Sequence, residues 1–249
     1  MSIEEEKKFL MSEINEYEFH NDNFKIFVEG DKYIGGFLTS KNNKDHPLNI
    51  INNCRAVYLS ILDFYSAIKF SIENALVYSY DENVNSFEKF KMFSDGYSSQ
   101  EEMFAYYFLN NAIYRLSSLW DFLAQFYNSL YGLEKNNRKI YYKAFFNSYK
   151  DKYAEFRQIS NYLIEIIDSN ESSEPYRKWS GNHKYLKNYR NKMTHINSPS
   201  ITIISNYDFN IKDHPLVILK RLCDEFNTLC SFIDTAVSIA NSKFLKMNL

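Results

Sequence analysis

Helix-breaking residues are scarce in this sequence, with only 6 Gly and 4 Pro among 249 residues. Hairpins and tight turns depend on these two residues, so their scarcity argues against a fold rich in β-hairpins. Hydrophobic residues make up 45% of the chain and include 21 Tyr and 21 Phe, enough for a large and mostly aromatic core. The length allows one large helical domain or two small ones. We expect an all-α fold of long helices in a single domain over residues 1–249.

Features of secreted, metal-binding and membrane proteins are also missing. Cys54, Cys223 and Cys230 are odd in number and form no Cys-x-x-Cys pair, which indicates neither a disulfide framework nor a zinc site. No apolar run approaches the ~20 residues of a membrane span, and the N-terminal residues lack the apolar stretch of a signal peptide. We therefore expect a reduced, cytoplasmic protein with no membrane contact, no bound metal and no cofactor.

Apolar residues recur at helical spacing along most of the chain. They predict two long helices, over about 47–80 and 100–130. Residues 21–46, where Phe24, Ile26 and Val28 alternate, are expected to form a small β-hairpin or an extended arm near the N-terminus. Other helices are expected over about 3–17, 138–168, 175–196 and 215–244, with a loop or short helix over 81–98 and a short strand or extended connector over 200–204. The sequence thus predicts a helical bundle built on the two long helices.

The string Lys-Asp-His-Pro-Leu occurs twice, at residues 44–48 and 212–216, each time at the start of a predicted long helix. Proline suits the first helical turn, and a nearby aspartate favours the positive end of the helix dipole. We interpret both copies as helix starts, although His46 and His214 would also allow a metal pair. Acidic residues on the other long helix are interpreted as helix caps and surface: Glu101, Glu102 and Asp121.

Acidic residues are absent from residues 175–207, although the whole chain has a formal net charge of -2. The same window carries six cationic residues: Arg177, Lys178, Lys184, Lys187, Arg190 and Lys192. A mildly acidic chain therefore has one local basic segment.

A helix over this window has two unlike faces. Aromatic and aliphatic residues lie on the side that faces the core: Tyr185, Leu186, Tyr189, Met193 and Ile196. Polar residues gather on the opposite side: Lys184, Lys187, Asn188, Asn191, Thr194 and His195. Arg190 lies at the margin, where its long side chain can reach the polar face. His183 lies at the rim and is expected at the surface.

The polar face has the groups needed for attack of a ribose 2′-hydroxyl on the adjacent phosphate, a reaction that requires no metal. His195 titrates near neutral pH and can transfer the proton. The Arg190 guanidinium can bind the phosphate and stabilise its developing charge. Asn191, one turn before His195, can orient the imidazole or bind phosphate. Three lysines are candidates for holding the backbone of a single-stranded or loop RNA: Lys184, Lys187 and Lys192.

Arg190-Asn191, followed by three residues and His195, resembles the Arg-x4–6-His motif of the HEPN superfamily. The resemblance implies an all-α fold with two long antiparallel helices at its centre, and a homodimer in which both motifs meet in one cleft. It further implies a metal-independent endoribonuclease that acts on RNA, often as a bacterial toxin or defence effector, with an antitoxin or defence-system protein as partner. The roles of the motif in that superfamily can be assigned in this chain only to Arg190, Asn191 and His195.

Two other interpretations stay open from the sequence. The same basic face would also serve a non-catalytic HEPN-like module that binds a nucleotide, RNA or a partner protein. Alternatively, Arg190 and His195 are incidental residues of a helical scaffold, because cations near the C-terminal end of a helix are stabilised by its dipole.

Overall fold

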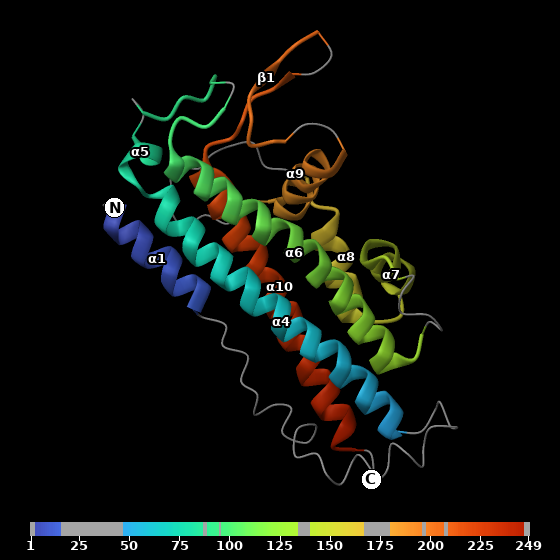
Figure 1. Cartoon of the computed structure of the whole chain (residues 1–249). Coiled ribbons are helices and arrows are strands. Elements are labelled where there is room, and N and C mark those ends of the chain that lie inside the picture. Colours follow the sequence, from blue (N-terminus) through green and yellow to red (C-terminus); the bar gives the residue numbers. More distant parts are fainter. Residues whose placement is uncertain are drawn as a thin grey trace. The chain divides into compact units, whose positions relative to one another are not determined.

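The computed structural model describes residues 3–15, 47–86, 89–94, 96–133, 140–166, 180–195, 198–206 and 209–246, so the arm expected over 21–46 lies outside these ranges. Helices dominate the described chain (Figure 1): α1 (Ile3–Asn15), α4 (Pro47–Ser79), α5 (Glu82–Asn85), α6 (Gln100–Tyr131), α7 (Tyr142–Tyr149), α8 (Ala154–Leu163), α9 (Asn182–His195) and α10 (Pro215–Phe244). The short strands β1 (Ile203–Ile204) and β2 (Phe209–Asn210) pair antiparallel. The predicted all-α class is confirmed.

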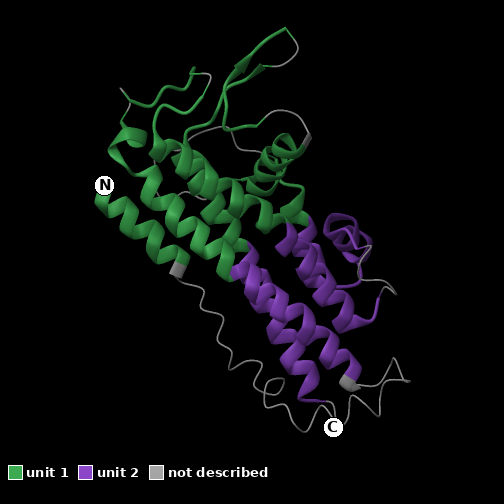
Figure 2. Cartoon of the chain, viewed as in Figure 1, with its two compact units in different colours: residues 1–17, 66–117, 161–228 green, residues 18–65, 118–160, 229–249 purple. Residues whose placement is uncertain are grey.

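The chain divides into two compact units (Figure 2). Unit 1 comprises residues 1–17, 66–117 and 161–228, and unit 2 comprises residues 18–65, 118–160 and 229–249. The boundaries fall inside α4, α6 and α10, so each of these helices contributes residues to both units. That the chain folds as one domain stays a prediction.

The two long helices α4 and α6 run antiparallel. In unit 1, Asn111 of α6 donates a hydrogen bond to Ser71 of α4 at 3.0 Å. Further along α4, Tyr78 packs against the earlier residue Phe104 of α6, with ring centroids 5.1 Å apart. Contacts that advance along one helix while they recede along the other define an antiparallel pair, as the resemblance to the HEPN superfamily implied.

Aromatic residues form much of the core, as the composition predicted. In unit 2, the fully buried ring of Phe156 on α8 has six aromatic neighbours with centroids 4.9 to 6.4 Å away: Tyr127, Tyr131, Phe145, Phe146, Tyr149 and Tyr153. Most of these pairs are edge-to-face or tilted, the arrangement that the ring quadrupole favours. Each described helix is too short or too polar to span a membrane.

A buried ion pair corrects the surface position expected for Glu102. Both Glu102, near the start of α6, and Lys212, just before α10, have fully buried side chains, and their Oε1 and Nζ atoms lie 2.5 Å apart. Lys212 Nζ also donates to the Gly96 carbonyl at 2.9 Å, and the Ser98 backbone N–H donates to Glu102 at 2.6 Å. The two charges are buried together because each compensates the desolvation of the other.

His214 in the second Lys-Asp-His-Pro-Leu string confirms the predicted helix start. The Leu216 N–H donates to His214 Nδ1 at 3.1 Å, which caps α10 directly before Pro215. Nε2 therefore carries the ring proton and donates to the Val84 carbonyl at 3.0 Å. Burial lowers the pKa of His214, against smaller opposing effects of the Val84 carbonyl and Glu102. Both ring nitrogens are engaged within the protein, whereas His46 of the first string lies outside the described ranges.

Candidate functional site

The motif helix α9 begins at Asn182, later than the predicted start near residue 175. Gly181 adopts a φ of 70°, a left-handed conformation that glycine tolerates and that interrupts a right-handed helix. Residues 175–179, which include Arg177 and Lys178, lie outside the described ranges. The described helix runs to His195, and Ile196, its predicted end, lies outside the described ranges.

The apolar stripe predicted for the inner face of α9 is confirmed for Leu186 and Tyr189, whereas Tyr185 and Met193 are half-buried and Ile196 lies outside the described ranges. Leu186 and Tyr189 are buried. The Tyr189 hydroxyl donates to Asn110 of α6 at 3.2 Å, and the Tyr185 hydroxyl donates to Asp213 at 2.7 Å. Burial raises the pKa of both tyrosines, so both hydroxyls stay protonated as hydrogen-bond donors.

His183 contradicts its expected surface position. Its side chain is nearly fully buried, and Nδ1 lies 2.9 Å from Oε1 of Glu225 on α10. The Tyr162 hydroxyl donates to the other oxygen of the same carboxylate. Residues 175–207 contain no aspartate or glutamate, but Glu225 of α10 contacts the buried His183 of this segment. A partner 42 residues away in the chain keeps His183 inside the protein.

Two further contacts hold the start of α9 against α10. Arg221 donates from Nη1 to the Asn182 side chain at 2.9 Å, and its guanidinium carbon lies 4.7 Å from the ring centroid of Tyr185. Asn182 in turn donates to Asp224 at 3.4 Å. Arg221, Asp224 and Glu225 are spaced to share one face of α10, and this close spacing of three charged residues was the available signal for the contact.

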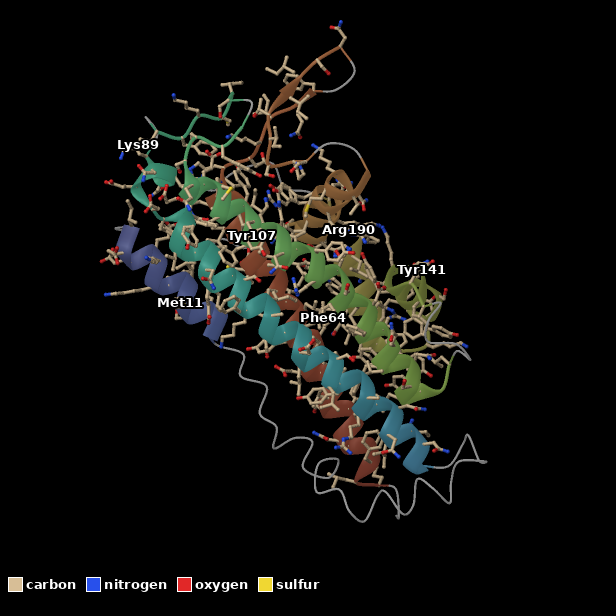
Figure 3. The ribbon with its side chains drawn as sticks, in the orientation of Figure 1. Met11, Phe64, Lys89, Tyr107, Tyr141 and Arg190 are labelled. Carbon is tan, nitrogen blue, oxygen red and sulfur yellow. The ribbon has the colours of Figure 1, made fainter. Side chains whose placement is uncertain are left out.

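Arg190, labelled in Figure 3, contacts an aromatic ring of α6. Its guanidinium carbon lies 5.9 Å from the ring centroid of Tyr114 on α6, within the range of a cation–π contact. Its Nε atom is buried and has no hydrogen-bond partner in the described part of the chain. No carboxylate among the described residues forms an ion pair with it. An aromatic ring therefore supports the guanidinium, while its Nε donor is unsatisfied among the described residues.

The other two motif residues follow Arg190 on the same helix. Asn191 is half-buried, and its backbone carbonyl accepts a hydrogen bond from the Thr194 hydroxyl at 3.2 Å. His195 is the last residue of α9, and its side chain lies outside the described part of the structure. All three residues thus stand within the last two turns of α9.

The three candidate RNA-binding lysines have different surroundings. Lys184 is exposed and Lys187 is half-buried. Lys192 is exposed but donates to the Asn210 side chain on β2 at 3.0 Å, which ties the motif helix to the strand pair. Lys184 is therefore the clearest of the three as a cation that faces solvent.

Metal-ligating side chains do not gather in the described ranges. No group of three or more His, Cys, Asp or Glu residues there has the arrangement that could hold a metal ion. None of the three cysteines forms a disulfide, and all three are buried.

Residues 59–245 match the model of the family described as Cthe2314-like HEPN. The match covers most of the chain, and the chain belongs to this family. The comparisons with curated proteins and with solved structures gave no match.

Proposed function

We propose that this HEPN protein is a metal-independent endoribonuclease. The observation that supports the proposal best is the state of Arg190, which is half-buried against Tyr114 with a buried Nε that has no partner among the described residues. A buried donor left without a partner costs about 1–3 kcal/mol. A phosphate would bind the guanidinium with charge-assisted hydrogen bonds.

The reaction forms a bond between the ribose 2′-oxygen and phosphorus and breaks the bond from phosphorus to the 5′-oxygen. One group must take the 2′-hydroxyl proton, and one must give a proton to the leaving oxygen. His195 serves as one of these groups, and Arg190 neutralises the charge that builds on the phosphate. Asn191 orients the imidazole or the phosphate. The products carry a 2′,3′-cyclic phosphate and a 5′-hydroxyl.

A homodimer is part of the proposal. Two copies related by a two-fold axis would bring two Arg190 and two His195 side chains into one cleft, which supplies an acid and a base from identical residues. Lys184, Lys187 and Lys192 hold the RNA backbone and give binding a dependence on salt. We further propose that the enzyme acts as a toxin or defence effector with a neutralising or defence-system partner protein.

The test is cleavage of a mixed RNA pool by purified protein in EDTA, with Arg190→Ala and His195→Ala beside the wild type. Arg157→Ala is a matched control, because Arg157 is an exposed arginine that belongs to unit 2, whereas α9 belongs to unit 1. We expect the wild type and Arg157→Ala to release cyclic phosphate ends, and the two motif variants to release none. Equal cleavage by all four proteins would identify a contaminant and refute the proposal. RNA binding without cleavage would instead support the non-catalytic HEPN module.

A further inference from the structure

A stripe of exposed aromatic and apolar side chains runs along α6 in unit 1. Met103, Tyr107 and Tyr114 are spaced four and seven residues apart, which places them on one side of the helix. Tyr107 is 61% exposed and Tyr114 is 52% exposed, whereas tyrosine is usually of intermediate burial. We call Tyr107 and Tyr114 the tyrosine stripe.

Neighbouring helices fix the position of the stripe. Between the two tyrosines, Asn110 accepts a hydrogen bond from Tyr189 of α9, and Asn111 donates one to Ser71 of α4. The stripe therefore lies on the exposed side of α6, between its contacts with α9 and with α4. The motif helix borders it, because the Arg190 guanidinium carbon lies 5.9 Å from the ring centroid of Tyr114.

The charge around the stripe suits a polyanion. Residues 103–120 of α6 contain no aspartate or glutamate, and neither do residues 182–195, which form α9. Aromatic rings beside an arginine and a lysine-bearing helix, without carboxylates on either helix segment, combine the two elements of single-strand nucleic-acid sites. These elements are cations for the phosphates and flat rings for the bases.

We propose that the tyrosine stripe is a base-stacking surface, on which the bases of unpaired RNA stack while Arg190 holds a neighbouring phosphate. This inference rests on the proposed function for the role of Arg190 as a phosphate ligand. The faces of unpaired bases are free to stack on Tyr114 and Tyr107, whereas bases in a duplex are already stacked on each other. The surface therefore selects single-stranded segments and loops without reading a particular base.

The experiment measures RNA binding separately from cleavage, in protein that carries His195→Ala. The probes are a fluorescein-labelled single-stranded 12-mer of mixed sequence, the same strand without bases, and the corresponding duplex, each followed by fluorescence anisotropy. The variants are Tyr114→Ala, Tyr107→Ala and Tyr114→Phe. Tyr141→Ala is the matched control, because Tyr141 is an exposed tyrosine of unit 2 (77% exposed; Figure 3).

Loss of one base stack predicts a Kd for the single strand that is ~5- to ~150-fold weaker in Tyr114→Ala. Tyr107→Ala should weaken binding in the same direction. Tyr114→Phe, which retains the ring, should recover most of the affinity lost in Tyr114→Ala, and Tyr141→Ala should bind like its parent. Binding of the strand without bases and of the duplex should change little in any tyrosine variant. Circular dichroism melting of each variant shows that the fold is intact.

Three outcomes would overturn the stacking surface. They are unchanged single-strand binding in Tyr114→Ala, no RNA binding by the parent at low salt, and a tyrosine variant that becomes monomeric in ultracentrifugation while its parent is dimeric. The last outcome would assign the stripe to contact with a second copy. The two proposals fail separately. Cleavage abolished by Arg190→Ala with unchanged binding by Tyr114→Ala rejects only the stacking surface. Ring-dependent binding without any cleavage rejects only the ribonuclease.

Discussion

Replacing Lys212 with methionine removes the positive half of the buried ion pair and leaves the Glu102 carboxylate inside the protein. Both side chains are fully buried, so water cannot solvate the remaining charge. The hydrogen bonds from Ser98 to Glu102 persist, but the bond from Lys212 to the Gly96 carbonyl is lost as well. Removing one partner of a buried pair costs about 3–5 kcal/mol. For a chain of this size that lowers the melting temperature by roughly 6–20 °C.

The assay is urea and thermal unfolding followed by far-ultraviolet circular dichroism. Lys220→Met is the matched control, because Lys220 pairs with Glu6 but both side chains are partly exposed (35% and 21%). Its loss should cost no more than about 1 kcal/mol. The double variant Lys212→Met with Glu102→Gln should recover most of the loss, because no uncompensated charge remains. If Lys212→Met costs no more than Lys220→Met, the argument from charge burial is wrong.

Three further predictions concern single groups. Burial lowers the pKa of His214 below its unfolded value of about 6.5. Its contribution to stability is therefore full above that pH and lost as the pH falls. His214→Asn keeps a capping acceptor but does not titrate, so its unfolding midpoint should change less between pH 7 and pH 5 than that of the wild type. Burial raises the pKa of Cys54 to about 12 and also raises the pKa of Cys223, and Cys230 is buried as well. All three thiols should therefore be unreactive toward a disulfide reagent at pH 8 in the native protein and react once urea unfolds it. Rapid reaction in the native state would contradict their burial. Lys184→Met should reduce the slope of log affinity against log salt for single-stranded RNA by about 0.7, whereas an unchanged slope would place Lys184 away from the phosphates.

The long helices could be predicted from the sequence because their signals are local. The last helix was predicted to start at Pro215 and to end near Phe244, and α10 has these bounds. Proline, a histidine cap and a regular apolar pattern all lie within or next to it. The start of the motif helix was wrong because the φ of 70° at Gly181 depends on how the turn before Asn182 folds. The second strand, Phe209–Asn210, was not predicted, since a two-residue strand has too few positions to show alternation.

The candidate site was predictable only in part, because some of its contacts involve residues that are distant in the chain. Helical periodicity placed Leu186 and Tyr189 on the inner face correctly. It could not place His183 or Glu102, because their charged partners Glu225 and Lys212 lie 42 and 110 residues away in the chain. Whether a polar residue is buried depends on such distant partners. The contact of Arg190 with Tyr114 depends in the same way on which helices become neighbours.

The hydrogen bonds of α9 are distributed unevenly along its length, and this has a consequence for its exchange with solvent deuterium. Asn182, His183, Tyr185 and Tyr189 all bond to side chains of neighbouring elements, whereas past Tyr189 the described side-chain bonds to another element come from Lys192 alone. Amides of the first turns should therefore exchange only through opening of the surrounding core, and those of the last turn through local fraying. An RNA held at Arg190 would slow exchange in the last turn and leave the first turns unchanged.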